Sequence, residues 1–180
     1  MLNCDLIIPV RRAQHNLGVE EDRLSDRPGT KLLYVPPPLA FVLAFLAGVA
    51  LNHARPLALP PPLAGVGAAI GAVGIAAGAG LIVGAIALFI HRRTTIVPSA
   101  APARLVVTGP YRLTRNPMYL GLTSLFLGLA LALPSFWSLL FVPAPLLLLQ
   151  GVIIPFEEAR MRATFGADYE TYCRRVGRWL

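Results

Sequence analysis

The chain has 180 residues, of which 56% are hydrophobic and 14% are charged, and its mean hydropathy is +0.64. A soluble domain of this length has closer to about a quarter charged residues, so the composition excludes an ordinary soluble fold and predicts an integral membrane protein. The net charge of +7 does not predict nucleic-acid binding, because the basic residues lie between the apolar stretches and form no compact patch.

Residues 1–34 are polar, nearly balanced in charge, and lack the basic start and apolar core of a secretory signal. We interpret them as a flexible cytoplasmic lead, followed by a single membrane domain over residues 35–180. Cys4 and Cys173 are far apart and the three histidines are scattered, so the sequence predicts neither a disulfide nor a metal site.

Two apolar stretches in the first half of the chain predict two membrane-spanning helices, over about residues 35–54 and 63–90. Proline is tolerated at the entrance of a helix, and Pro36 to Pro38 stand at the entrance of the first. The second is rich in small residues four apart, which allow close helix packing in lipid. These pairs are Gly67/Gly71, Gly74/Gly78 and Gly80/Gly84. Packing is the favoured interpretation, and room for a lipid-like substrate is the alternative.

A hairpin in the membrane follows, because 41 uncharged residues separate Arg115 from Glu157. One crossing needs about 20 apolar residues, so this stretch predicts two spans, over residues 117–133 and 136–156. With the turn at Pro134-Ser135, the polar linker (residues 91–116) and the tail (residues 157–180) must lie on the same side of the membrane.

The distribution of Lys and Arg orients these spans. There are five in the lead, one after the first span, five after the second, none in the hairpin turn and five in the tail. This alternation follows the positive-inside rule. It predicts an all-α membrane protein with about four transmembrane helices, both termini in the cytoplasm, and the plasma (bacterial inner) membrane as its location.

The tail is expected to form two short helices. Gly166 divides it and is typical of a helix end, and Asp168 is expected to cap the second helix.

Asn116-Pro117 predicts the start of the third span, because Asn is a strong N-cap and Pro is favoured at the first helical position. The bland interpretation is a well-capped helix at the membrane surface. It leaves unexplained the polar side chains around the cap, which are Tyr111, Arg112, Arg115 and Tyr119. A helix N-terminus beside arginines suits a carboxylate or a phosphate.

Glu157 and Glu158 stand where the fourth span leaves the membrane. They could act as carboxylates of a first helical turn, with Glu158 paired to Arg162, or they could bind ribose hydroxyls or an ammonium group. Tyr169 and Tyr172 share a helix face, which is usual for core or interfacial aromatics but could also wall an adenine pocket. Spacing alone leaves these alternatives open.

Taken together, the motifs resemble the isoprenylcysteine carboxyl methyltransferase family, which is related to membrane phosphatidylethanolamine N-methyltransferases. The resemblance covers roughly residues 94–180 and rests on GPYRLTRNPMYLG (residues 109–121), the apolar hairpin, Glu157-Glu158, FGADYETY and a terminal Arg-Trp. It implies that S-adenosylmethionine binds at the cytoplasmic face and that a lipophilic or lipidated acceptor enters from the bilayer.

Carried over residue by residue, the resemblance implies Arg115 and Asn116 as the catalytic pair. The residues implied to bind the cofactor are Gly109, Pro110, Tyr111, Arg112, Asn116, Pro117, Tyr119, Gly121, Glu157, Glu158, Tyr169 and Tyr172. The family pattern has His where this chain has Asn116. Asn can donate a hydrogen bond and cap the helix, but it cannot titrate near neutral pH.

The sequence therefore predicts a membrane-embedded, S-adenosylmethionine-dependent methyltransferase. The absence of histidine from the matched half favours a carboxylate or thiolate acceptor over an amine, which would have to lose a proton. The alternatives are an NADPH-dependent reductase of the sterol-reductase type, a phospholipid N-methyltransferase, and a non-catalytic membrane protein with the same fold. Glu157-Glu158 favours the methyltransferase over the reductase.

Overall fold

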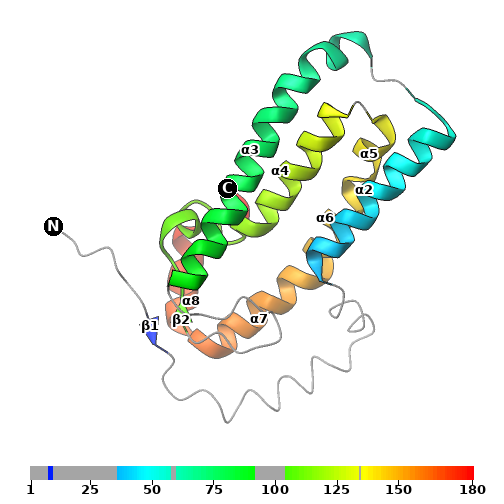
Figure 1. Cartoon of the computed structure of the whole chain (residues 1–180). Helices are drawn as coiled ribbons and strands as arrows, with labels where there is room; N and C mark the ends of the chain where they lie inside the picture. The colour runs from blue at the N-terminus through cyan, green and yellow to red at the C-terminus, as the bar shows by residue number, and fades with distance from the viewer. Residues whose placement is uncertain (1–7, 10–35, 58–59, 92–103, 134) are drawn as a thin grey trace. The chain divides into compact units, whose positions relative to one another are not determined.

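The structure, a computed structural model, describes residues 8–9, 36–57, 60–91, 104–133 and 135–180 (Figure 1). The regular secondary structure of these residues is helical apart from one short antiparallel pair, in which β1 (Ile8–Pro9) pairs with β2 (Arg104–Leu105). The predicted all-α class is thus confirmed. Of the lead, only Ile8–Pro9 lies among the described residues, and the polar linker is described at His91 and from Arg104 onward.

The chain divides into two compact units. The core unit comprises Tyr34–Ile82 and Met118–Gly151, and the motif unit comprises Met1–Leu33, Val83–Pro117 and Val152–Leu180.

Within the described ranges, three helical segments are long and apolar enough to cross a membrane, namely Pro37–Ala54, Gly65–His91 and Phe136–Phe165. The first is α2 (Pro37–Ala54), with Pro36 at its N-cap position, and the second belongs to α3 (Pro61–His91). The predicted third span is α4 (Pro117–Ala132), whose 16 residues are about 24 Å long against about 30 Å of hydrocarbon. A count of four spans therefore stays a prediction.

The last apolar segment is an almost unbroken helix that continues past residue 156, where the sequence predicted its end. It consists of α5 (Phe136–Phe141), α6 (Pro143–Leu148), the π-helical turn η3 (Leu149–Ile153) and α7 (Ile154–Phe165). A proline lacks the N–H and crowds the carbonyl four residues earlier. Pro155 and Gly151 have this relationship, which accounts for a widened turn here.

Within the core unit, α3 and α4 run antiparallel and very close together (Figure 1). A Cβ added to Gly71 would lie 2.6 Å from the carbonyl oxygen of Gly128, and one added to Gly78 would lie 2.6 Å from that of Gly121. The packing interpretation is confirmed for these glycines. The Gly80/Gly84 pair is the exception. An added Cβ meets nothing within 4 Å at Gly80 and only the side chain of Pro110, at 3.6 Å, at Gly84.

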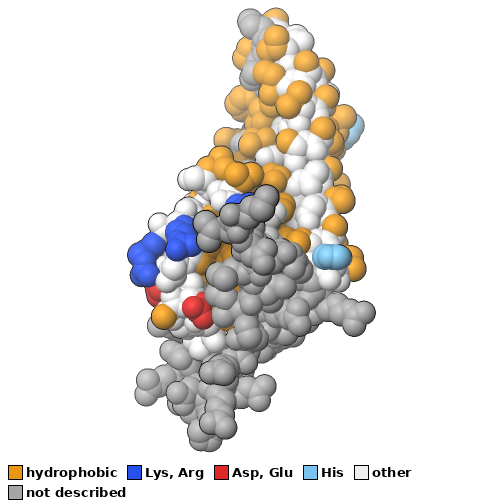
Figure 2. All heavy atoms as spheres, turned by 90° about the vertical axis from the view of Figure 1, so that its left-hand side faces the viewer, with side chains coloured by type: hydrophobic (Ala, Val, Ile, Leu, Met, Phe, Trp, Pro, Cys, Tyr) orange, Lys and Arg blue, Asp and Glu red, His pale blue; other side chains and the backbone are white. Residues whose placement is uncertain are grey.

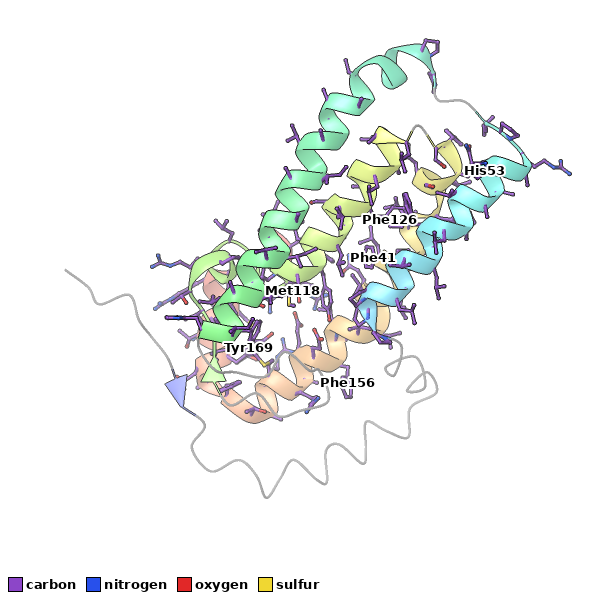
Figure 3. The ribbon with its side chains drawn as sticks, in the orientation of Figure 1. Phe41, His53, Met118, Phe126, Phe156 and Tyr169 are labelled. Carbon is purple, nitrogen blue, oxygen red and sulfur yellow. The ribbon has the colours of Figure 1, made fainter. Side chains whose placement is uncertain are left out.

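Aromatic and small residues join α2 to its neighbours in the same unit. Phe126 of α4 packs edge-on against Phe41 and Phe45, with ring centroids 6.2 and 5.4 Å apart (Figure 3). Gly48 lies against Ser138 of α5, leaving no room for a Cβ. Apolar side chains remain exposed in this unit, as at Leu43, which is 56% exposed. Figure 2 shows hydrophobic side chains over the upper part of the face that it draws. An apolar exterior is what a lipid environment requires.

In the motif unit, α7 ends at Gly166, whose φ of 52° favours glycine, and α8 (Ala167–Arg175) begins directly afterwards. The predicted division of the tail is confirmed. The predicted cap is wrong: Gly166 occupies the N-cap position of α8 without a side-chain hydrogen bond, and Asp168 lies in the first turn. There its carboxylate can still interact favourably with the helix dipole.

Candidate functional site

The predicted catalytic pair lies in a short polar segment that the end of the chain covers. Thr114 is fully buried, and its hydroxyl donates to the carbonyl of Arg178 at 3.0 Å. The side-chain amide of Asn116 donates to the same carbonyl at 2.9 Å, and the backbone N–H of Arg115 donates to Gly177 O at 3.0 Å. The side chains of Thr114 and Asn116 and the backbone N–H of Arg115 thus hold residues 177–178 against residues 114–116.

Glu158 is the acidic centre of the motif unit. Its carboxylate, 7% exposed, accepts two hydrogen bonds from Arg178, at 3.0 Å to Oε1 and 2.8 Å to Oε2. Arg115 Nη1 lies 3.2 Å from Oε1, and Arg162 Nη2 lies 3.6 Å from Oε2. The predicted i, i+4 pair with Arg162 is confirmed. Three guanidinium groups therefore share one nearly buried carboxylate, which meets the requirement that a buried charge be paired.

The hydrogen bonds from Arg178 to the Glu158 carboxylate raise the pKa of Arg178 above its ordinary value. Arg162 is also held by Glu170, with Nε 2.8 Å from Oε1. Arginine side chains gather with acidic ones on the surface of this unit (Figure 2). Glu157, next to Glu158, is half-buried.

Three of the four tyrosines implied by the resemblance, Tyr111, Tyr169 and Tyr172, are buried in the same unit. Tyr169 and Tyr172 form a hydrophobic cluster with Leu105 and Phe165. The Tyr172 hydroxyl donates to the backbone carbonyl of Tyr111 at 2.7 Å, which ties α8 to the upstream motif. This packing accounts for both rings of α8 as core residues, and contact with an adenine ring stays a prediction.

Burial raises the pKa of the Tyr111, Tyr169 and Tyr172 hydroxyls well above the ordinary tyrosine value. All three therefore remain neutral over the physiological pH range. They can donate or accept hydrogen bonds but do not supply a phenolate base.

The GPYR segment forms a 3₁₀ turn, η2 (Gly109–Arg112). Gly109 has a φ of 60°, a conformation that favours glycine. Tyr111 packs edge-on against Phe89 at the end of α3, with ring centroids 5.6 Å apart. Arg112 is exposed and has an interaction partner. Gly109, Pro110, Tyr111 and Arg112 thus lie in the motif unit.

Pro117, the first residue of α4, is buried and also belongs to the motif unit. Tyr119 and Gly121 belong to the core unit. A Cβ on Gly121 would lie 2.7 Å from Ile82 and 2.9 Å from the carbonyl oxygen of Gly78, so helix packing is sufficient to explain this glycine. The carbonyl of Tyr119 accepts a hydrogen bond from Thr123.

Sequence reasoning missed Thr114 and Arg178 as residues of this polar cluster, and it missed the buried indole N–H of Trp179, which follows Arg178 in the chain. The Arg-Trp pair was visible as part of the resemblance, but nothing in its local spacing connects it to Glu158 or Asn116. Cys173 was set aside because it predicted no disulfide. It is a free thiol whose sulfur accepts a hydrogen bond from Arg115 Nη1 at 2.7 Å.

Two buried donors in the motif unit have no hydrogen-bond partner in the described structure, Arg115 Nε and Trp179 Nε1. Buried polar atoms are normally paired, so such donors fit a ligand with acceptor groups. S-adenosylmethionine offers a carboxylate, ribose hydroxyls and ring nitrogens as acceptors, and the residues present fit it in this respect. Among the described residues, no three His, Cys, Asp or Glu side chains group together as a metal would require.

Comparison with known protein families gives a match over the middle of the chain. The phospholipid methyltransferase family matches residues 66–168, more than half of the chain and including Arg115, Asn116, Glu157 and Glu158. No curated protein and no solved structure matches the chain. With its long apolar helices, the chain is an integral membrane protein, and it belongs to the phospholipid methyltransferase family.

Proposed function

We propose that this protein is a membrane-embedded methyltransferase that uses S-adenosylmethionine and methylates a lipid-like acceptor. The observation that carries the proposal is the polar cluster of the motif unit. In it, Arg115 and Asn116 meet Glu158 and the chain end, and two buried donors are left without partners. The family match supports the reaction class.

The residues proposed to hold the cofactor are those of the motif unit. Arg115 Nε and Trp179 Nε1 would donate to its acceptor groups, and Asn116 and Glu157 would contribute further polar contacts. When bound, S-adenosylmethionine supplies a methyl group already activated by its sulfonium. The chain then needs mainly to orient the reactants and keep water out, which is consistent with a cluster that offers few proton-transfer groups.

The class of methyl acceptor is inferred from the small number of groups in this cluster that could act as a general base. The three buried tyrosines stay neutral, and Glu158 is held by arginines. A carboxylate acceptor is already ionised at neutral pH and needs no base, so we favour a lipidated carboxylate, as in the isoprenylcysteine methyltransferases. A thiolate acceptor is compatible with the same cluster.

A phospholipid amine is the second candidate, and the family match favours it directly. An ammonium group must lose a proton before it can accept a methyl group, and Glu157 is the half-buried carboxylate nearest in sequence to the cluster. The NADPH-dependent reductase is less well supported, because the matching family is one of methyltransferases.

Purified protein in detergent tests the proposal. Titration calorimetry should detect binding of S-adenosylmethionine and none of NADPH. Methyl transfer from the radiolabelled cofactor to a farnesylated cysteine derivative or to phosphatidylethanolamine then separates the two acceptor classes. Alkali releases methanol from a methyl ester but leaves an N-methyl group in place. Binding of NADPH without binding of S-adenosylmethionine would overturn the proposal.

A further inference from the structure

Arg178 connects two parts of the motif unit through two different groups. Its backbone carbonyl accepts hydrogen bonds from Thr114 and Asn116, at 3.0 and 2.9 Å. Its guanidinium binds both oxygens of Glu158 on α7. Arg178 thus joins the Asn116 segment to α7 through its backbone and its side chain together.

The geometry of the Glu158 pair requires an arginine. A planar guanidinium can donate two parallel hydrogen bonds to a carboxylate, whereas a lysine ammonium is a point charge and cannot reproduce that fork. Glu158 is 7% exposed and Arg178 is 36% exposed, so Arg178 covers the carboxylate from its outer side. The same carboxylate receives Arg115 at 3.2 Å. The position of Arg115 is therefore linked to Arg178 through Glu158.

The segment that Arg178 holds also carries one of the unpaired donors. Trp179 follows directly, and its buried Nε1 has no partner among the described residues. Arg115, with its unpaired Nε, is held through its backbone N–H by Gly177. Both donors thus depend on the same docked segment, Gly177 to Trp179, for their placement.

We infer that Arg178 is a positioning residue of the cofactor site, which fixes the segment Gly177 to Trp179 and the Glu158 carboxylate so that Arg115 and Trp179 present their free donors to the ligand. This inference rests on the proposed function. It assigns to Arg178 no contact with the reacting atoms. It differs from a purely structural role, in which Arg178 would stabilise the fold and leave cofactor affinity unchanged.

Arg178→Gln and Arg178→Lys test this assignment, with Arg175→Gln as a matched control that removes the same charge from an exposed position of α8. The affinity for S-adenosylmethionine is measured by calorimetry, well below each variant's unfolding temperature, and KM and kcat are measured separately. Arg178→Gln should weaken binding by about tenfold or more, equivalent to about 1.4 kcal/mol. Arg178→Lys should fall between it and the wild type, and Arg175→Gln should stay within about twofold. Unchanged affinity in Arg178→Gln, with only a lower unfolding temperature, would overturn the inference.

A second measurement needs only the unaltered protein. Hydrogen exchange is followed for peptides that cover residues 173–180 and 111–117, with and without S-adenosylmethionine. The ligand should slow exchange in both peptides, because it would occupy donors that the docked segment holds in place. Binding without any protection of residues 173–180 would overturn the inference and leave the proposed function standing. If the wild type binds no S-adenosylmethionine, the proposed function fails as well.

Discussion

The side-chain amide of Asn116 donates a 2.9 Å hydrogen bond to the backbone carbonyl of Arg178, 62 residues further along the chain. Asn116 precedes Pro117 at the start of α4, where its side chain was expected only to cap the helix and to meet the cofactor. An Asp or Ser side chain at this position would not place an N–H donor beside the carbonyl of Arg178. The position therefore has a tertiary role that can be separated from capping.

Substitutions of Asn116 should separate these roles. Asn116→Ser retains a good helix cap but loses the donor to Arg178, and Asn116→Ala loses both. We expect Asn116→Ala to lower the free energy of unfolding by roughly 0.5–2 kcal/mol for the cap, plus about 0.5–1.5 kcal/mol for the hydrogen bond. Asn116→Ser should lose only the second amount. Denaturant unfolding in detergent measures both, and equal losses in the two variants would show that the hydrogen bond dominates.

Asn116→His restores the residue of the related family and should keep much of the S-adenosylmethionine affinity, because a ring N–H can also donate. With a carboxylate acceptor, the wild-type rate should show no ionisation near pH 6.5 from this position, whereas Asn116→His should introduce one. The pH profile of methyl transfer is the measurement. Full activity and normal cofactor affinity in Asn116→Ala would show that Asn116 serves only to start the helix and has no part in binding or catalysis.

Glu158→Gln should be much more harmful than Glu157→Gln. The first leaves three arginines without their shared charge and weakens the hydrogen bonds from Arg178, so we expect a loss of about 1.5–3 kcal/mol in unfolding free energy. For Glu157→Gln, which neutralises a half-buried carboxylate inside the continuous helix Phe136–Phe165, we expect a loss of about 1 kcal/mol or less. Cofactor affinity is measured alongside. A fall of more than about tenfold in either variant supports a part in binding, and no fall in both removes these carboxylates from the proposed site.

Gly128→Ala and Gly80→Ala make a matched pair in the core unit. A Cβ on Gly128 would lie 2.7 Å from Gly71 O and Ile75 N, so α3 and α4 would have to separate. We expect a loss of about 1–3 kcal/mol from such overpacking. At Gly80 a Cβ meets nothing within 4 Å, and the effect should stay within about 1 kcal/mol. Thermal unfolding in detergent compares them, and similar midpoints would contradict the close approach.

The orientation of the chain is tested with single cysteines in a Cys4→Ser, Cys173→Ser background, in which the serine hydroxyl at position 173 still offers an acceptor to Arg115. The distribution of Lys and Arg predicts that an impermeant reagent labels Pro61→Cys in intact cells but neither Ser99→Cys nor Arg175→Cys. Ser99 lies outside the described residues, so only the sequence supports its placement. The reverse labelling pattern would invert the topology.

The apolar helices were predictable because their composition leaves few alternatives. The sequence placed the first span at 35–54 and the second at 63–90, against observed helices at Pro37–Ala54 and Pro61–His91. The start of α4 at Pro117 was predicted to the residue, since Asn-Pro fixes it locally. The continuation of the last helix beyond residue 156 was missed, because the appearance of charge was taken as the end of the helix.

The candidate site was only partly predictable. The Glu158–Arg162 pair lies four residues apart on one helix and follows from spacing. The Arg178–Glu158 pair spans 20 residues and a change of helix direction at Gly166, and the Asn116–Arg178 bond spans 62 residues. No local pattern encodes these contacts, because they depend on how α8 packs against Tyr111 through Tyr172.

The 62-residue separation between Asn116 and Arg178 also has a consequence during synthesis. At about 5–20 residues per second, a ribosome makes Arg178 about 3–12 seconds after Asn116. Throughout that interval the donors of Thr114 and Asn116 and the amide of Arg115 lack the carbonyl partners that they have in the finished protein. The nascent motif must therefore remain hydrated, or be sheltered by the insertion machinery, while the apolar hairpin that follows it enters the bilayer.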